Sequence, residues 1–337
     1  MQATLTQIEQ LPKLELHVHL ESTMDGQKLA GYAARCGKTM VRPPETLYQC
    51  SADDLSHFLA FLDYICSLVG DTDALSEIAY DFARRSADEN ILYGETILNP
   101  THWGQFTVPQ LIAALTDGFD RAAADGGTDC RFTLSLSRNQ SAADAQALVD
   151  TMVACRTPRL VGLSIDGNEA LTGRTGEKFS PVFARAHAAG FGITVHAGES
   201  SGPEGVWDAL ELLFADRLDH GVRAAEDSAL VARLAREEIP LNLCLTSNLT
   251  LLYRDPAAHP LSMLHRAGIP LNFSRDDPTF LGLTLTEELS RVAAFADFSL
   301  ADLVLCQHHA VDAAFCDADQ KNALHAALYR FSPLEVR

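Results

Sequence analysis

Eight short apolar segments rich in β-branched residues recur along the chain, and each is followed by residues with helical spacing of apolar side chains. This alternation favours a parallel sheet, because neighbouring parallel strands need a long crossover, most often a helix. Eight such units in 337 residues predict a closed (β/α)8 TIM barrel, with a doubly wound open sheet as the alternative. The expected strands are Leu14–His19, Ile91–Leu98, Arg131–Leu136, Leu160–Ile165, Gly192–His196, Arg217–His220, Pro240–Cys244 and Pro270–Ser274.

Two segments depart from the plain repeat. Residues 25–89 hold several helical patterns between the first two strands, one of them with an apolar stripe at Leu55, Phe58, Leu59, Leu62 and Ile65. Because an insertion after the first strand lies over the catalytic end of a barrel, we expect this segment to act as a lid. Residues 299–330 are expected to add C-terminal helices. No linker or composition shift interrupts the chain, so residues 1–337 are expected to form one domain.

The composition narrows the partners and the compartment. A formal net charge of −19 argues against a phosphate-binding surface, and therefore against nucleic acid. A neutral or cationic small molecule suits this charge better. The eight cysteines form no Cys-x-x-Cys pair, and no signal segment or membrane-length apolar run is present. We therefore expect a cytoplasmic protein with reduced thiols and no membrane contact; the oligomeric state stays open.

Histidines and one aspartate mark the ends of four expected strands. His17 and His19 alternate on one face at the end of the first strand. His196 ends the fifth strand, His220 ends the sixth, and Asp276 follows the eighth. Since the carboxyl ends of barrel strands form a single rim, these groups are expected to converge.

Three histidines and one carboxylate are a ligand set that suits zinc with one position left for water. Such a metal lowers the pKa of its water from 15.7 to about 7, which predicts metal-assisted hydrolysis. Barrels that hold two metals bridge them with a modified lysine after the fourth strand. Here that end reads Asp166-Gly167-Asn168-Glu169, without lysine, so one zinc ion per chain is expected.

Four further residues near these strand ends are candidates for binding or catalysis. Glu199, three residues after His196, is expected to donate a proton if its carboxyl is dry. His220 is either a fourth histidine ligand or the base that holds the attacking water. Asp277 is free to bind a substrate, and Gly167 offers a backbone N–H that no side chain obstructs.

The pattern at these residues resembles the adenosine and adenine deaminase family of the amidohydrolase superfamily. The resemblance covers nearly the whole chain. Its motifs are Pro12-Lys13-Leu14-Glu15-Leu16-His17-Val18-His19-Leu20-Glu21, Tyr93-Gly94-Glu95, Gly167-Asn168-Glu169, His196-Ala197-Gly198-Glu199, Asp219-His220-Gly221, Thr246-Ser247-Asn248 and Asp276-Asp277-Pro278.

The resemblance implies one zinc ion held by His17, His19, His196 and Asp276. It implies that Glu199 protonates the purine ring and that His220 orients and deprotonates the water. It further implies substrate contacts from Asp277, Gly167, His19 and Glu21. The base deaminases of the other zinc scaffold need Pro-Cys-x-x-Cys, which this chain lacks.

Departures from the family pattern bear on the substrate. Many adenosine deaminases carry Asp-Gly after the second histidine, where the aspartate contacts the ribose, whereas this chain has Glu21-Ser22. Ile97, Leu245 and Arg275 also differ from the residues common in the family. The leading expectation is deamination of adenosine to inosine. The alternatives are free adenine, a modified adenosine, an amidohydrolase acting on a non-purine substrate, and a non-catalytic binding barrel.

Overall fold

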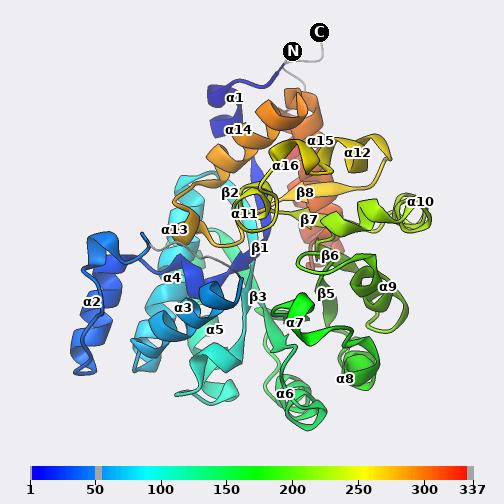
Figure 1. Ribbon diagram of the computed structural model, residues 1–337. Coiled ribbons are helices and arrows are strands. Elements are labelled where there is room, and N and C mark those ends of the chain that lie inside the picture. The colour runs from blue at the N-terminus through cyan, green and yellow to red at the C-terminus, as the bar shows by residue number, and fades with distance from the viewer. Residues whose placement is uncertain (1, 50–54, 332–337) are drawn as a thin grey trace.

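A sheet of eight parallel strands, ordered β1 to β8, forms the centre of the molecule (Figure 1). The computed structural model describes residues 2–49 and 55–331. A bridge between Val18 and Asp276 joins the last strand to the first, so the sheet is a nearly closed barrel, as predicted. The strands are β1 (Lys13–His19), β2 (Ile91–Leu98), β3 (Asp129–Ser137), β4 (Leu160–Asp166), β5 (Gly192–Ala197), β6 (Arg217–His220), β7 (Leu241–Leu243) and β8 (Leu271–Phe273).

Helices surround the strands and cover their outer side. They are α1 (Leu5–Gln10), α2 (Gly26–Arg35), α3 (Leu55–Ser67), α4 (Thr72–Asp88), α5 (Val108–Ala124), α6 (Ala142–Ala154), α7 (Glu169–Thr172), α8 (Gly176–Ala188), α9 (Pro203–Glu211), α10 (Ser228–Arg236), α11 (Leu245–Leu251), α12 (Leu261–Arg266), α13 (Pro278–Leu281), α14 (Leu285–Ala296), α15 (Leu300–Ala313) and α16 (Ala318–Phe331). Short 3-10 helices include η1 (Leu20–Thr23) and η3 (Pro100–Trp103). Within the described residues, no helix has both the length and the hydropathy needed to cross a bilayer.

Local signals explain where the helices begin. The Asp71 carboxylate accepts a hydrogen bond from the N–H of Ala74, which caps α4. Thr284 and Glu287 form a reciprocal capping box at the start of α14. The apolar side chains of Leu163 and Ile165 on β4 belong to the core between strands and helices. On the same strand, Ser164 and Asp166 are buried but polar. Polar side chains thus alternate with core side chains along this strand and gather inside the barrel.

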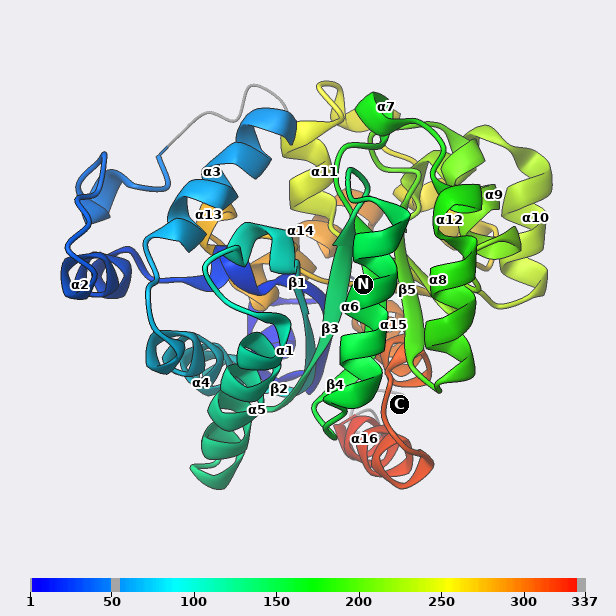
Figure 2. The ribbon, with the colours of Figure 1, turned by 90° about the horizontal axis from the view of Figure 1, so that it is seen from below.

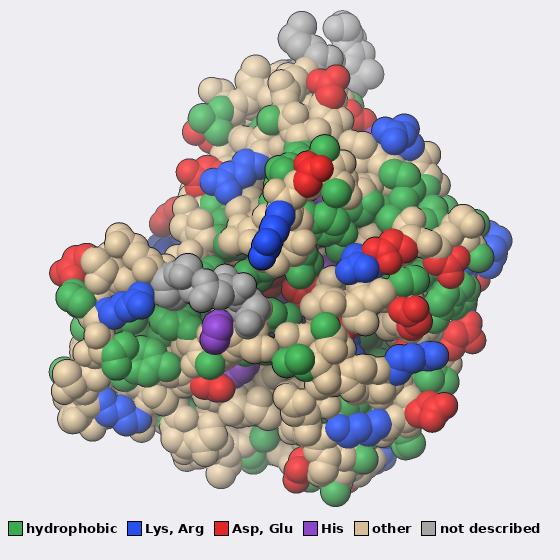
Figure 3. Space-filling view, viewed as in Figure 1, with side chains coloured by type: hydrophobic (Ala, Val, Ile, Leu, Met, Phe, Trp, Pro, Cys, Tyr) green, Lys and Arg blue, Asp and Glu red, His purple; other side chains and the backbone are tan. Residues whose placement is uncertain are grey.

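The two ends of the barrel carry different parts of the chain. α3 and α7 lie at one end, and α16 lies at the other (Figure 2). The segment between β1 and β2 contains α2, α3 and α4, as the expected insertion requires. Lys, Arg, Asp and Glu side chains are intermixed on the face seen in Figure 3, without a large patch of one sign.

Candidate metal centre and active site

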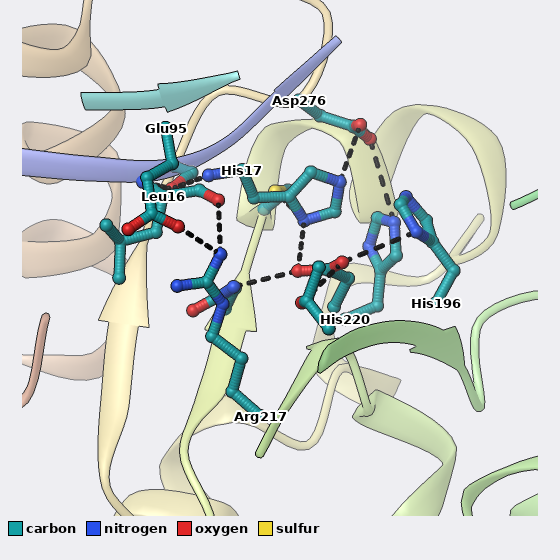
Figure 4. A network of polar contacts seen from close by, with 12 residues as sticks. Leu16, His17, Glu95, His196, Arg217, His220 and Asp276 are labelled. Atoms are coloured by element: carbon teal, nitrogen blue, oxygen red, sulfur yellow. Dashed lines mark hydrogen bonds and ion pairs between the residues drawn. The ribbon is translucent and has the colours of Figure 1, made fainter. Parts of the chain in front are cut away.

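The four predicted metal ligands, His17, His19, His196 and Asp276, offer ligand atoms that all lie within 4.8 Å of one another. Figure 4 shows three of them, His17, His196 and Asp276. The Nε2 atoms of His17 and His19 lie 3.2 Å and 3.4 Å from Asp276 Oδ1. The Nε2 atoms of His19 and His196 lie 3.1 Å apart. Strands β1 and β5 and the turn after β8 therefore bring together residues that are up to 259 positions apart in the printed sequence, from 17 to 276.

The spacing of these atoms fits a shared cation. Tetrahedral ligands about 2.05 Å from a zinc ion lie about 3.3 Å from one another. The three distances between 3.1 and 3.4 Å match that separation. His17 Nε2 is buried and has no hydrogen-bond partner among the described residues. Three imidazoles and a carboxylate whose ligand atoms face a common centre form a donor set suited to a divalent metal.

The Asp219 carboxylate contacts the Nδ1 atoms of two of these histidines, on the side of each ring away from the common centre. Its Oδ1 lies 3.6 Å from His17 Nδ1, and its Oδ2 lies 3.5 Å from His196 Nδ1. Thr194 Oγ1 and Asn242 Nδ2 donate to the same carboxylate at 2.8 Å and 2.7 Å. A carboxylate behind a metal-binding histidine fixes its ring orientation and raises its basicity.

Two residues of the site other than glycine have left-handed backbone conformations. The φ angle is 64° at His220 and 63° at Asp276, values that are uncommon outside glycine. Because this turn interrupts the alternation at the end of β6, the neighbours Asp219 and His220 both contact the histidine cluster. Such local strain is typical of functional sites.

His220 is fully buried, and its Nδ1 is hydrogen-bonded to a neighbouring amide. Burial lowers the pKa of its imidazole to about 4, so the ring is neutral at pH 7. The N–H of Leu261 donates to His259 Nδ1 at 3.2 Å, and His259 Nε2 faces Asn248 Oδ1 at 3.3 Å. Asn248 Nδ2 then donates to His220 Nδ1 at 3.0 Å. This chain of bonds puts the proton of neutral His220 on Nε2, 3.6 Å from Glu199 Oε1.

Glu199 is a buried carboxyl at the same centre. Burial, together with the charges of Asp276 and Glu169, raises its pKa to about 8. The carboxyl is therefore protonated at neutral pH when the site is dry. Gly198, with φ of 61°, turns the chain after β5 so that Glu199 lies beside the cluster.

The loop that carries Glu199 is held in place by two buried charged side chains, Glu169 and Arg138. Glu169 accepts hydrogen bonds from the backbone N–H groups of Gly198 at 3.2 Å and Glu199 at 2.9 Å. Arg138 donates to the carbonyl of His196 and lies 3.7 Å from Glu169 Oε1. These two side chains thus set the position of the loop between a predicted ligand and the predicted proton donor.

A small cavity of about 30 Å³ opens beside the cluster. Gly167, with φ of 103°, and Asp277 both line it, as do His19 and Glu199. Burial and the neighbouring Asp276 hold the pKa of the Asp277 carboxyl well above its usual range, which favours its protonated form. The apolar wall of the cavity is formed by side chains of α3, namely Leu55, Phe58, Leu59 and Leu62.

Glu21, the other predicted substrate contact, points elsewhere. Its Oε1 accepts hydrogen bonds from the backbone N–H of Asn99 at 2.7 Å and from Trp103 Nε1 at 3.0 Å. The side chain is fully buried and does not line the cavity.

Two departures from the family pattern also find a place. Arg275 makes two bonds to the Glu15 carboxylate, at 2.8 Å and 2.7 Å, and one to Glu89 at 2.7 Å, away from the cavity. Its role is therefore structural. The Ser22 hydroxyl donates to the carbonyl of His19 at 3.0 Å and is hydrogen-bonded to Asp277, so it supports two residues of the site.

Two larger cavities lie elsewhere. One, of about 250 Å³, lies between α2 and α4, and the other, of about 860 Å³, lies against α15 and the starts of several strands. Neither is lined by a predicted site residue. The predicted site residues that line a cavity therefore all line the smallest of these three cavities.

Residue patterns alone did not reveal the supporting side chains. Asp219, Glu169 and Asn248 stand inside motifs that were recognised, but the motifs assigned them no role. A carboxylate inside an apolar strand, as in Leu218-Asp219-His220, is the signal that marks Asp219. Arg138 carries no such signal, because a single arginine after a strand is common.

Comparison with known proteins gives a consistent result. A family model described as adenosine deaminase matches residues 12–331. An adenine deaminase from Rhodospirillum rubrum is 34% identical over 326 residues, covering 94% of this chain and 96% of that protein. An adenosine deaminase from Escherichia coli is 31% identical over 326 residues, covering 93% and 96%.

Solved structures agree in fold. A zinc-bound amidohydrolase from Burkholderia ambifaria is 30% identical, with a TM-score of 0.90 over 98% of this chain and 93% of that one. An adenine deaminase from Arthrobacter aurescens aligns with a TM-score of 0.88 over 95% and 99% of the two chains. At 22% identity, that second likeness concerns the fold alone.

Proposed function

Because the chain belongs to the adenosine deaminase family and is therefore a hydrolase acting on C–N bonds, we propose that it deaminates free adenine to hypoxanthine and ammonia, using one zinc ion. The supporting observation is the convergence of a four-ligand cluster, a protonated carboxyl at Glu199 and a second protonated carboxyl at Asp277 around one narrow cavity. Each group has a separate task on a 6-aminopurine ring.

His17, His19, His196 and Asp276 would hold the metal. When bound, a divalent ion there supplies a water molecule with a pKa near 7 as the nucleophile. His220, with its Nε2–H directed into the site, orients that water by donating a hydrogen bond. A role as base, which the family resemblance implies, would require the Asn248 amide to be reversed, because its Nδ2 now occupies the lone pair of His220 Nδ1.

The remaining residues act on the purine. Glu199 gives its proton to N1, next to the carbon that carries the amino group, and makes that carbon more electrophilic. Protonated Asp277 donates to N7, and the backbone N–H of Gly167 donates to N3. Water adds to C6 and ammonia leaves, so adenine plus water becomes hypoxanthine plus ammonia.

Free adenine is proposed over adenosine because of Glu21. A sugar would need polar partners along the cavity, and Glu21 does not line it; its Oε1 accepts hydrogen bonds from Asn99 and Trp103 instead. The R. rubrum relative, named adenine deaminase, supports the same choice. Adenosine, the leading expectation from the motifs, is the second candidate, because the E. coli relative at 31% identity is named adenosine deaminase.

The insertion after β1 is proposed as the cover of this site. α3 supplies the apolar wall of the cavity, and its Asp63 accepts a bond from His102 Nδ1 at 2.6 Å. Gln105 Nε2 donates to the carbonyls of Cys66 and Val69 at 2.9 Å each, which fixes the end of this helix. An apolar cover excludes water and strengthens the polar contacts beneath it.

An ammonia-release assay with adenine, adenosine and a methylated adenosine, on protein of measured metal content, tests the proposal. We expect kcat/KM for adenine to exceed that for adenosine by at least about 100-fold, since a polar group that loses its partner costs about that much in discrimination. A higher kcat/KM for adenosine would reverse the choice. Absence of ammonia with every substrate would reject purine deamination.

A further inference from the structure

A buried carboxylate oxygen in the cavity wall has no partner among the described residues. Asp166, the last residue of β4, lines the cavity and is only 5% exposed. Its Oδ1 accepts a hydrogen bond from Asn99 Nδ2 at 2.6 Å, whereas its Oδ2 accepts none. An unpaired buried carboxylate oxygen is costly and calls for a donor from outside the chain.

The neighbouring groups fix which oxygen stays open. Asn99 Oδ1 accepts from the N–H of Thr101 at 3.0 Å and from its hydroxyl at 2.7 Å, so the amide cannot reverse. Asn99 Nδ2 therefore faces Asp166 Oδ1. His102, the other titratable group near this carboxylate, directs its Nδ1 to Asp63 on α3. Asp166 Oδ2 remains available on the cavity side.

The order of groups around the cavity follows the order of atoms around a purine. Glu199 comes from the end of β5, Gly167 from the end of β4, and Asp277 from the turn after β8. Their proposed partners are N1, N3 and N7. Asp166 leans from β4 toward Asn99 at the end of β2, which places it between Gly167 and Asp277 on the side away from Glu199. The purine atom between N3 and N7 on that side is N9.

We infer that Asp166 is a specificity-determining residue that accepts a hydrogen bond from N9–H of the free base, an inference that rests on the proposed function. Consecutive residues then offer a matched pair, the carboxylate of Asp166 for N9–H and the backbone N–H of Gly167 for N3. A nucleoside carries its sugar on N9 and has no hydrogen there. Binding it would leave the buried oxygen unpaired and bring carbon against it, so the site selects bases over nucleosides.

The test compares adenine with 9-methyladenine, which differs only at N9, on the zinc-loaded protein. For the wild type we expect kcat/KM to be at least about 100-fold higher for adenine. In Asp166→Ala, adenine should lose about 10- to 100-fold in kcat/KM, the range for a hydrogen bond to a charged group. The value for 9-methyladenine should stay the same or rise, so the preference collapses.

Two further variants separate hydrogen bonding from shape. Asp166→Asn keeps the volume, but its Oδ1 stays toward Asn99 and its NH2 meets N9–H, so adenine should lose as much as in the alanine variant. Ser164→Ala is the matched control, because Ser164 is a buried residue two positions earlier on the same face of β4 and does not line the cavity. It should keep the preference of the wild type.

Binding of purine and 9-methylpurine, which carry no amino group and are not deaminated, gives a readout that does not depend on turnover. Calorimetry should find that the wild type binds purine at least about 10-fold more tightly than 9-methylpurine. Asp166→Ala should bind the two ligands with equal affinity. Equal affinity or equal kcat/KM for the two N9 forms in the wild type would overturn the role of Asp166 while leaving purine deamination intact. If adenine is not deaminated but purine is still preferred over 9-methylpurine, the proposed function fails and the role of Asp166 stands.

Discussion

Two buried polar clusters lie next to each other inside the barrel, and they are built in opposite ways (Figure 4). The metal-ligand cluster gathers three imidazoles and one carboxylate whose inner atoms face a common point. The second cluster, called here the inner ion pair, joins Arg217 to Glu95 at 2.6 Å. Tyr93 and the backbone of Phe315 donate to the other oxygen of Glu95, at 2.8 Å and 2.6 Å.

The difference lies in where each cluster finds its partners. In the inner ion pair, both oxygens of Glu95 have donors from the chain. Arg217 also donates to the carbonyl of Ala313 at 2.9 Å and stacks on Phe315, and among its side-chain nitrogens only Nε has no hydrogen-bond partner in the described part of the chain. The metal-ligand cluster leaves a buried nitrogen of His17 without a hydrogen bond among the described residues. A cluster whose ligand atoms face a common open centre serves function, while an ion pair whose charges are paired within the chain serves the fold. Breaking the two should therefore give different phenotypes.

The largest effect is expected from removing the carboxylate of the metal-ligand cluster. Asp276→Ala should lose the metal and reduce kcat/KM for adenine by at least about 10⁴-fold, because the activated water depends on the ion. Metal analysis and ammonia release check this. Added zinc should stabilise the wild type by about 3 kcal/mol at a free concentration of 100 Kd, and should not stabilise the variant.

Asp208→Asn is the control for Asp276→Ala. Asp208 is equally buried, on α9, but its partner is Arg174 at the surface, and it is not one of the four grouped ligands. It should keep both metal and turnover. Full metal content in Asp276→Ala would show that this aspartate is not a ligand.

Changing Glu199 should separate chemistry from metal binding. Glu199→Gln keeps the shape of the side chain but has no proton to give to N1, so kcat should fall by about 10² to 10⁴-fold. Metal content and melting temperature should stay near those of the wild type, because Glu199 is not among the four grouped ligands. Turnover within about threefold of the wild type would refute its role as proton donor.

The inner ion pair should respond in stability rather than in metal content. Arg217→Met leaves the Glu95 carboxylate buried without its cation, which should reduce the free energy of unfolding by about 3 to 5 kcal/mol. Folded Arg217→Met should still bind one metal equivalent. Denaturant unfolding checks the first expectation, and the double variant Arg217→Met with Glu95→Gln should recover part of the loss. A decrease below about 1 kcal/mol would mean that Arg217 does not stabilise the buried charge of Glu95.

Local patterns predicted the parts of the molecule that depend on regular strands. The alternation of short apolar runs with helices predicted eight parallel strands, and the strand ends predicted that His17, His19, His196 and Asp276 would meet. The alternation rule stops where the backbone leaves the strand, and the left-handed turn at His220 is such a place.

Local sequence patterns could not predict the contacts between loops. The hydrogen bonds that Glu169 accepts from the N–H groups of Gly198 and Glu199 join segments that are about 30 positions apart, and nothing in either segment specifies the other. Glu21 and Arg275 were recognised as departures, but their bonds to Trp103 and Glu15 depend on packing between elements. The single-domain organisation and the roles assigned to site residues stay predictions.

The smallest effect is expected at Glu288, a buried carboxyl that belongs to neither cluster. It accepts hydrogen bonds from the backbone N–H of Thr246 at 3.1 Å and from the Thr246 hydroxyl, and burial raises its pKa to about 7. Between pH 4.5 and pH 7 the folded protein keeps this proton while the unfolded chain releases it. Because the folded state then binds more protons, stability should fall as pH rises through this window.

The decrease is at most about 3 kcal/mol, set by the difference between the folded pKa near 7 and the usual value of 4.5. Glu288→Gln keeps the shape without the titration, so the stability difference between wild type and variant should shift in favour of the variant from pH 4 to pH 8. Parallel denaturation curves at these pH values measure it, and titrations elsewhere cancel in the difference. A difference that does not change with pH would place Glu288 with the inner ion pair, as a carboxylate that stays charged because it has found a partner.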